Sequence, residues 1–309
     1  STILIRRALP RQAVVHGLRI NMPEIRLYAY SLALSIIVAD IVGFFTLVRT
    51  GQPEYFLVVF GFFLLIPGLI GRRIENKVKN IESFFTVFVR SLGLTYSTLR
   101  NYAQSIRSIL ASDLGLLTKH LRRLYARLRN GIDTKVAFLY FVGETGSETV
   151  RRGIDIFYDA VEAGGDPVKV GESLSTTIQR ILNLRKQREQ VARAFQGVIY
   201  VLTVLIVTLA EFVFTLTLLL QQVFAAAGAA QILPFAYIEP TIIIAIKIGF
   251  VFAITILNAF AIQFARGGYT GVAWLHAAVL LILSGATIII SSMFAQALFQ
   301  MVRLPQLIP

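Results

Sequence analysis

The chain has 309 residues, of which 56% are hydrophobic, and a soluble protein could not bury so large an apolar fraction. Its 30 lysines and arginines outnumber 17 aspartates and glutamates, and in a membrane protein this net charge of +13 indicates basic cytoplasmic loops and attraction to anionic lipids rather than binding of nucleic acid. The absence of cysteine excludes disulfides and thiolate ligands, and three scattered histidines predict no metal site.

Five apolar segments follow a basic N-terminal region. Residues 1–26 carry five arginines and no apolar run of the kind found in a cleavable signal peptide. A transmembrane helix needs about 20 mostly apolar residues. We therefore expect spans at residues 27–48, 55–70, 195–220, 241–264 and 272–299. The second is short, with Pro67 and Gly68 near its end.

A polar insert separates the second span from the third. Its apolar residues recur at helical spacing in five stripes, within residues 74–92, 99–109, 114–128, 150–161 and 170–181. Helix breakers separate the stripes: Gly93, Gly115, Asn130-Gly131, Gly143 to Gly146 and Gly164-Gly165. We predict five or six antiparallel helices here, the last of which, at about residues 167–193, continues into the third span.

The predicted fold is therefore all-α, a polytopic membrane protein with about five transmembrane helices and a cytoplasmic antiparallel helical bundle. We expect three regions: residues 1–72, 73–194 and 195–309. Residues 71–194 hold 21 basic and 12 acidic side chains, whereas residues 221–240 hold no lysine or arginine. Because cytoplasmic loops are enriched in basic residues, we expect the N-terminus and residues 71–194 to be cytoplasmic.

The segment Gly164-Gly165-Asp166-Pro167 predicts a helix corner. Glycine ends a helix readily in the left-handed conformation, Asp166 can cap the next helix, and Pro167 suits its first turn. A phosphate-binding loop would require a lysine followed by serine or threonine after a strand, but Lys169 precedes valine. Because we find no catalytic constellation either, we predict a protein that is not an enzyme and has no cofactor.

Three ionisable residues interrupt the apolar segments: Asp40, Glu211 and Lys247. A charge at the centre of a bilayer costs about 2.5–3.5 kcal/mol even on lenient scales. We therefore expect Lys247 to pair with Glu211 or with Asp40 and to fix the packing of the spans. Snorkelling to the headgroups, a water-lined cavity and a proton relay remain open alternatives.

Two basic groups lie on the predicted bundle. The first is a helix face opposite a leucine stripe, which is either a solvated surface or a docking site for an acidic protein; it consists of Lys119, Arg122, Arg123, Arg127 and Arg129. The second lies where the last helix approaches the third span and predicts contact with lipid headgroups; it consists of Arg185, Lys186, Arg188 and Arg193.

The order of these elements resembles a known family. The residues that carry the resemblance are Ser83 to Leu92, Asn130-Gly131, the helix 149–163, Gly164-Gly165, Leu174 and the segment from Gly267-Gly268 to His276. Over about residues 20–300 the chain resembles the type II secretion F domain family. More narrowly, it is similar to the archaeal FlaJ-like or TadC-like platform proteins of archaella and archaeal type IV pili.

This resemblance implies a non-enzymatic platform in the cell membrane. Its cytoplasmic domain would contact a hexameric secretion ATPase, and its spans would receive pilin-like or archaellin-like subunits; membrane lipids and a second copy of the chain are further expected partners. Archaellum platforms usually carry two such cytoplasmic domains, so a short pilus-type member, a dimerising half and a piece of a longer chain all stay open, as does archaellum against adhesive pilus.

A transporter or channel for small molecules or ions is the alternative function. Its path would be lined by the polar residues of the spans, namely Asp40, Glu211, Lys247, Asn258 and His276. We find no inverted repeat and no paired broken helices, which many transporters use. A membrane anchor for a regulatory bundle is a third reading.

Overall fold

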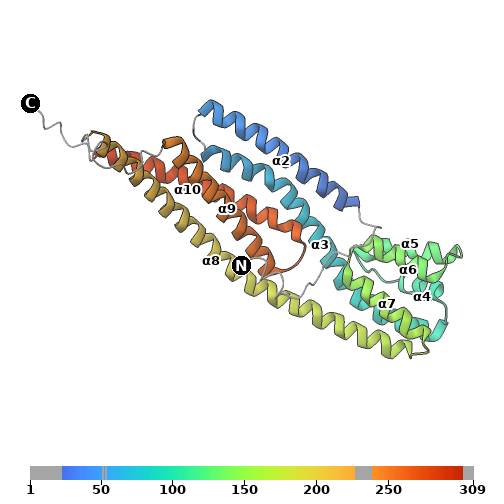
Figure 1. Ribbon diagram of the computed structural model, residues 1–309. Helices are drawn as coiled ribbons and strands as arrows, with labels where there is room; N and C mark the ends of the chain where they lie inside the picture. Colours follow the sequence, from blue (N-terminus) through green and yellow to red (C-terminus); the bar gives the residue numbers. More distant parts are fainter. Residues whose placement is uncertain (1–22, 51, 53, 227–238, 302–309) are drawn as a thin grey trace, which may run out of the picture. The chain divides into compact units, whose positions relative to one another are not determined.

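A computed structural model describes residues 23–301 apart from 51, 53 and 227–238, and within these residues every regular element is a helix (Figure 1). Five helices are long and apolar enough to cross a membrane. The predicted all-α polytopic membrane fold is therefore confirmed. The expected N-terminal arm, most of the 221–240 loop and the C-terminal end lie outside the described residues.

The five long helices extend further than the predicted spans. They are α2 (Pro23–Thr50), α3 (Glu54–Leu99), α8 (Pro167–Ala226), α9 (Pro240–Arg266) and α10 (Ala273–Met301), the last preceded by the short η2 (Thr270–Val272). The expectation that the helix before the third span continues into it is confirmed, because α8 is a single helix of 60 residues.

The helix of the second span does not end near Pro67, because α3 continues through it for 46 residues. Proline is tolerated in membrane helices, where neighbouring groups satisfy the backbone that it frees. Gly68 serves close packing instead of a helix end: a Cβ atom there would lie 2.6 Å from the Cα of Leu275 on α10.

The described residues form two compact units. The first comprises residues 23–30, 69–192 and 264–272, and the second comprises residues 31–68, 193–263 and 273–301. The helices α3 and α8 contribute residues to both units. The polar insert thus belongs to a different unit from the apolar segments on either side of it.

The first unit is a helical bundle. Four short helices, α4 (Tyr102–Ile109), α5 (Leu116–Arg129), α6 (Thr134–Thr145) and α7 (Glu148–Glu162), gather beside the end of α3 and the start of α8 (Figure 1). Most of the predicted stripes supply its core, whose largest fully buried side chains are Ile81, Phe85, Phe88, Leu92, Ile106, Leu117, Leu121, Phe141 and Phe157. The helical stripes therefore pack against one another, as amphipathic helices must in water.

Polar side chains cap the first turns of α4 and α6. Asn101 and Asp133 accept hydrogen bonds from the amides of Gln104 and Val136. At the predicted corner, Gly164 has a φ of +88°, and Asp166 accepts a hydrogen bond of 3.0 Å from the Val168 amide. The corner joins α7 to α8 through local capping alone.

Gly93 is not a helix breaker, contrary to the sequence prediction, but lies inside α3. A Cβ atom there would lie 2.4 Å from the carbonyl oxygen of Pro167 and 3.2 Å from the Cα of Gly171. The absence of a side chain therefore lets α3 and α8 approach closely. The prediction also missed α6, whose sequence is apolar on all sides and so shows no single stripe.

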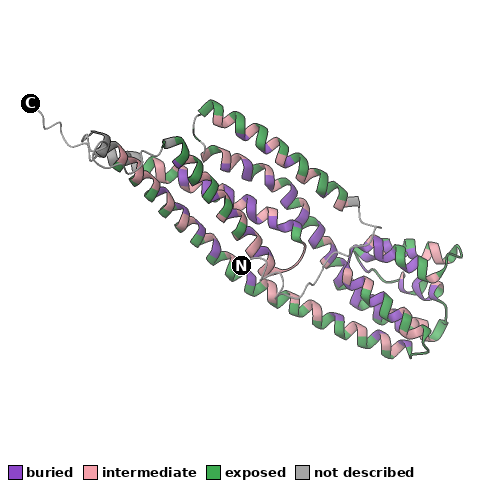
Figure 2. Ribbon diagram, viewed as in Figure 1, coloured by how far each residue is buried: buried purple, intermediate pink, exposed green. Residues whose placement is uncertain are grey.

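The second unit packs five apolar helical segments. Its core includes Leu57, Leu64, Val207, Val251 and Leu281. Large apolar side chains also cover the exposed faces of the spans, shown in green in Figure 2; on α2 they include Leu34, Ile37, Ile41 and Phe44. Such faces are stable in lipid, because hydrocarbon solvates them as well as a protein core does.

We predict that Gly93→Ala destabilises the protein by about 1–3 kcal/mol, because the new methyl group meets a backbone carbonyl that cannot turn aside. Gly197→Ala is the matched control, since a Cβ atom there meets nothing within 4 Å. It should be neutral or stabilising by up to about 1 kcal/mol through helix propensity. Thermal unfolding in detergent measures both. Equal effects of the two substitutions would contradict the close contact.

Candidate functional site

A charged cluster lies among the apolar helices of the second unit. The Nζ atom of Lys247 on α9 lies 3.0 Å from a carboxylate oxygen of Glu211 on α8 and 3.0 Å from one of Glu54 on α3. The three side chains are buried, with at most 16% of any one exposed. The expected pairing of Lys247 with Glu211 is thus present. Lys247 also pairs with Glu54, so that the cluster joins three helices.

Asp40 does not join this cluster, which corrects the expectation for the third ionisable residue. The side chain is exposed on α2, while its neighbour Ala39 is fully buried. Successive residues point about 100° apart on a helix, so only one of the two can face the core. Within the described part of the chain, Asp40 makes no ion pair or side-chain hydrogen bond. Sequence analysis missed Glu54 because it precedes the predicted span by one residue.

The other polar residues of the suggested transport path join neighbouring helices. The Asn258 amide donates a hydrogen bond of 2.9 Å to Thr203, which connects α9 to α8. The Nδ1 atom of His276 on α10 lies 3.1 Å from the hydroxyl of Tyr200 on α8. Because each has a side-chain partner, these residues contribute to helix packing, which polar side chains commonly stabilise in membranes.

Two buried carboxylates of α3 organise the first unit. Glu75 accepts hydrogen bonds from Arg266 (2.9 Å) and from the Tyr269 amide (3.2 Å), and its carboxylate lies 2.6 Å from Lys79 Nζ. Glu82 accepts hydrogen bonds from the Ser147 hydroxyl (2.6 Å) and from Arg185 (3.1 Å). Sequence analysis missed both, although each lies three or four residues from Val78 and so beside the apolar stripe.

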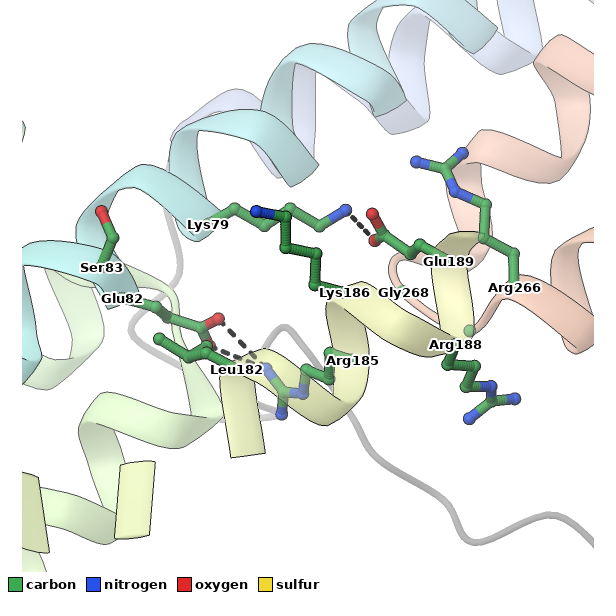
Figure 3. A pocket seen from close by; sticks show the side chains of 11 residues that line it. Lys79, Glu82, Ser83, Leu182, Arg185, Lys186, Arg188, Glu189, Arg266 and Gly268 are labelled. Carbon is green, nitrogen blue, oxygen red and sulfur yellow. Dashed lines mark hydrogen bonds and ion pairs between the residues drawn. The ribbon is translucent and has the colours of Figure 1, made fainter. Parts of the chain in front are cut away.

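A cavity of about 220 Å³ lies beside these carboxylates, bounded by α3, α8 and the end of α9 (Figure 3). Lys79 of α3 and Glu189 of α8 form an ion pair at one wall. The other lining residues include Ser83, Arg185, Lys186, Arg188, Arg266 and Gly268. The residues that line this cavity come from segments of which the most distant lie more than 180 positions apart in the sequence.

Of the four residues predicted to contact lipid headgroups, two have partners within the protein and two do not. Arg185 pairs with buried Glu82, and Arg188 donates hydrogen bonds to the carbonyls of Phe264 (2.7 Å) and Ala265 (2.9 Å) at the end of α9. These two are therefore structural contacts of the first unit, which corrects the expectation of free headgroup ligands. Lys186 and Arg193 are exposed and have no hydrogen-bond or ion-pair partner in the described ranges.

The basic face of α5 divides in the same way. Arg123 lies 3.5 Å from Glu144 of α6, and Arg127 both pairs with Glu144 and lies over the Tyr140 ring. Burial acts to raise the pKa of Glu144, but the hydrogen bond from Arg127 and the two arginine charges prevail and lower it. Burial lowers the pKa of His120, whose Nδ1 atom lies 3.6 Å from Glu144.

Three basic residues of α5 stay free: Lys119, Arg122 and Arg129 are exposed and meet no carboxylate among the residues that the structure describes. Arg123 and Arg127 instead fasten α5 to α6. The free surface is thus smaller than the five residues that the sequence suggested, and it consists of long side chains whose charges face solvent.

We predict that Lys247→Met lowers stability by roughly 3–5 kcal/mol, because it leaves two buried carboxylates without their counter-charge. Glu211→Gln should cost less, and the two effects should be non-additive by more than about 0.5 kcal/mol in a double-mutant cycle. Asp40→Asn serves as the control: because Asp40 does not contact Lys247, its effect on stability should add to that of Lys247→Met. Additive effects of Lys247→Met and Glu211→Gln, read from unfolding in lipid–detergent micelles, would exclude the ion pair.

Comparison with known proteins agrees with the resemblance drawn from the sequence. Residues 88–219, from the second half of α3 to the span of α8, match the family model of type II secretion system protein F. Flagella accessory protein J of Methanocaldococcus jannaschii is 31% identical over 209 residues, which cover 64% of this chain and 37% of that protein.

The protein of the same name from Methanococcus voltae is 28% identical over 138 residues, which cover 44% of this chain and 25% of that protein. The chain thus spans little more than a third of the first relative's length, and no solved structure matches it. The family match and the two relatives agree with the predicted resemblance: residues 88–219 are similar to the type II secretion F domain, and the chain is similar to the flagella accessory proteins J.

Proposed function

We propose that this protein is the membrane platform of an archaellum-like or type IV pilus-like assembly machine. The observation that carries the proposal is the F-domain match over residues 88–219, which covers most of the helical bundle and the span of α8. The similarity to two flagella accessory proteins supports the same class. The platform role is one of binding and transmission, without catalysis by this chain.

The free basic surface of α5 is the proposed docking site for a cytoplasmic secretion ATPase. Lys119, Arg122 and Arg129 carry charges that no carboxylate in the described part of the chain neutralises. Complementary charge accelerates association and selects partners. An acidic surface on the ATPase is therefore the complement that we expect, and the paired Arg123 and Arg127 hold α5 in place beneath it.

The second unit is the proposed site at which pilin-like subunits enter or leave the membrane. Because α3 and α8 are continuous helices that contribute to both units, a force applied to the bundle can act on the spans along their axes. The polar residues of the suggested transport path, apart from Asp40, each have a side-chain partner on another helix. We therefore favour this role over transport of ions or small molecules.

We predict that the triple substitution of Lys119, Arg122 and Arg129 by glutamate weakens binding of the ATPase by roughly tenfold or more, since it reverses the attraction. The control is a triple substitution by glutamate of Arg107, Lys169 and Arg180, which are equally exposed and lie off α5. Binding of the purified ATPase to the full chain in nanodiscs, at two salt concentrations, measures the difference.

The two triple variants change the net charge equally, so a general charge effect would weaken both alike. That result would exclude α5 as the docking site. No binding of the ATPase to the unsubstituted chain would exclude the coupling altogether.

We also predict that residues 71–194 are cytoplasmic, which the ATPase requires. The chain has no cysteine, so Ser112→Cys in the exposed loop before α5 introduces a unique thiol. A membrane-impermeant maleimide should label it only after the cells are lysed. Gln52→Cys, between α2 and α3, should be labelled in intact cells. The opposite pattern would show that the orientation is inverted.

A further inference from the structure

The cavity between α3, α8 and the end of α9 carries more positive than negative charge. Five basic side chains line it, namely Lys79, Arg185, Lys186, Arg188 and Arg266, against the two acidic side chains Glu82 and Glu189. Buried Glu75 contributes one further carboxylate through its contacts with Lys79 and Arg266. Two positive charges therefore remain uncompensated.

These surplus charges can be assigned to individual residues. Lys79, Arg185 and Arg266 each contact a carboxylate. The Arg188 guanidinium donates to two backbone carbonyls, which satisfy hydrogen bonds but do not cancel its charge. Lys186 has no partner in the ranges that the structure describes, and Figure 3 shows it reaching from α8 toward Lys79. Lys186 and Arg188 are thus the unneutralised cations.

The cavity wall is held in place before any ligand arrives. Gly267 and Gly268 follow α9 with φ values of +73° and +87°. A Cβ atom on Gly268 would lie 2.9 Å from Glu75, and one on Gly267 would lie 3.2 Å from Arg188. Because only glycine allows this turn and this close approach, the loop fixes the position of both charged side chains. Arg188 is thus a preorganised cation, which can interact with an anion without the cost of ordering its side chain.

The volume of the cavity and the sequence positions of its basic residues limit the class of ligand that it can bind. A volume of about 220 Å³ lies below the roughly 300 Å³ at which pockets for drug-sized molecules begin. Lys79 and Lys186 are each nine residues from the apolar stretch of their helix, and Arg266 ends α9 directly after its own. The cavity thus takes its cations from three helices that each also contain an apolar stretch.

We propose that this cavity binds a phosphate group, which either an anionic membrane lipid or free phosphate can supply. Lys186 contacts the phosphate directly, and Arg188 contributes charge at the wall. A purely structural role, in which ion pairs join α3, α8 and α9, accounts for the paired side chains. It does not account for the two cations without a carboxylate partner, Lys186 and Arg188. The proposal does not rest on the assembly function, because it is argued only from the charges and contacts around the cavity.

The test uses the full chain purified in detergent. Phosphatidylglycerol or zwitterionic phosphatidylcholine is added, and bound lipid is counted by native mass spectrometry; inorganic phosphate is titrated separately by calorimetry. Lys186→Glu should weaken binding of phosphatidylglycerol at least about tenfold by reversing the key charge. Ser83→Trp should do the same without a change of charge, because Ser83 lines the cavity and its side chain is exposed.

Arg193→Glu is the matched control, since Arg193 is an exposed cation on the same helix that does not line the cavity. It should leave binding within about twofold of the unsubstituted chain. Binding of phosphatidylglycerol with this pattern supports the proposal with a lipid as the source. Binding of inorganic phosphate alone, with the same pattern, supports it with free phosphate as the source.

Three results would overturn the proposal: binding of neither probe, equal losses in Lys186→Glu and Arg193→Glu, or full binding by Ser83→Trp. Circular dichroism of each variant confirms that a loss of binding is not a loss of fold. None of these outcomes bears on the proposed docking of the ATPase, which the substitutions on α5 test separately.

Discussion

The buried carboxylate of Glu82 is the contact on which the bundle depends. It lies on α3, accepts a hydrogen bond from the serine that caps α7, and pairs with Arg185 of α8. One side chain thus determines how three helices meet. A charge so deeply buried is costly without partners, so the helices are stable only in the arrangement that supplies both of them. Apolar packing alone would tolerate several rotations of these helices.

The same constraint recurs in both units. Glu75 holds Lys79, Arg266 and the loop after α9, while Glu54 and Glu211 enclose Lys247 among the spans. In each place a carboxylate meets at least one cation from a helix that is distant in sequence. Where cations outnumber carboxylates, as around Lys186 and on α5, charge is left for an external partner. The surfaces to which we assign binding are those where this internal pairing is incomplete.

The platform role that we propose requires this division of roles. In this proposal the paired charges fix the helices, so that a load on the bundle would move them without loosening their contacts. The unpaired charges would carry recognition of the partner. Glycine-mediated approach of α3 to α8 at Gly93 and Gly171 adds rigidity at the point where the two longest helices of the bundle meet.

Local sequence patterns predict the fold class, the five spans, the helical character of the insert and the corner at Gly164, because hydropathy, periodicity and capping act within a single segment. The pairing of the charges depends instead on contacts between segments. Whether Arg185 faces lipid or Glu82, whether Lys247 meets Asp40 or Glu54, and whether Gly93 ends a helix or lets another approach depend on how helices are rotated and packed. These contacts join residues up to about 190 positions apart, and no local pattern specifies them.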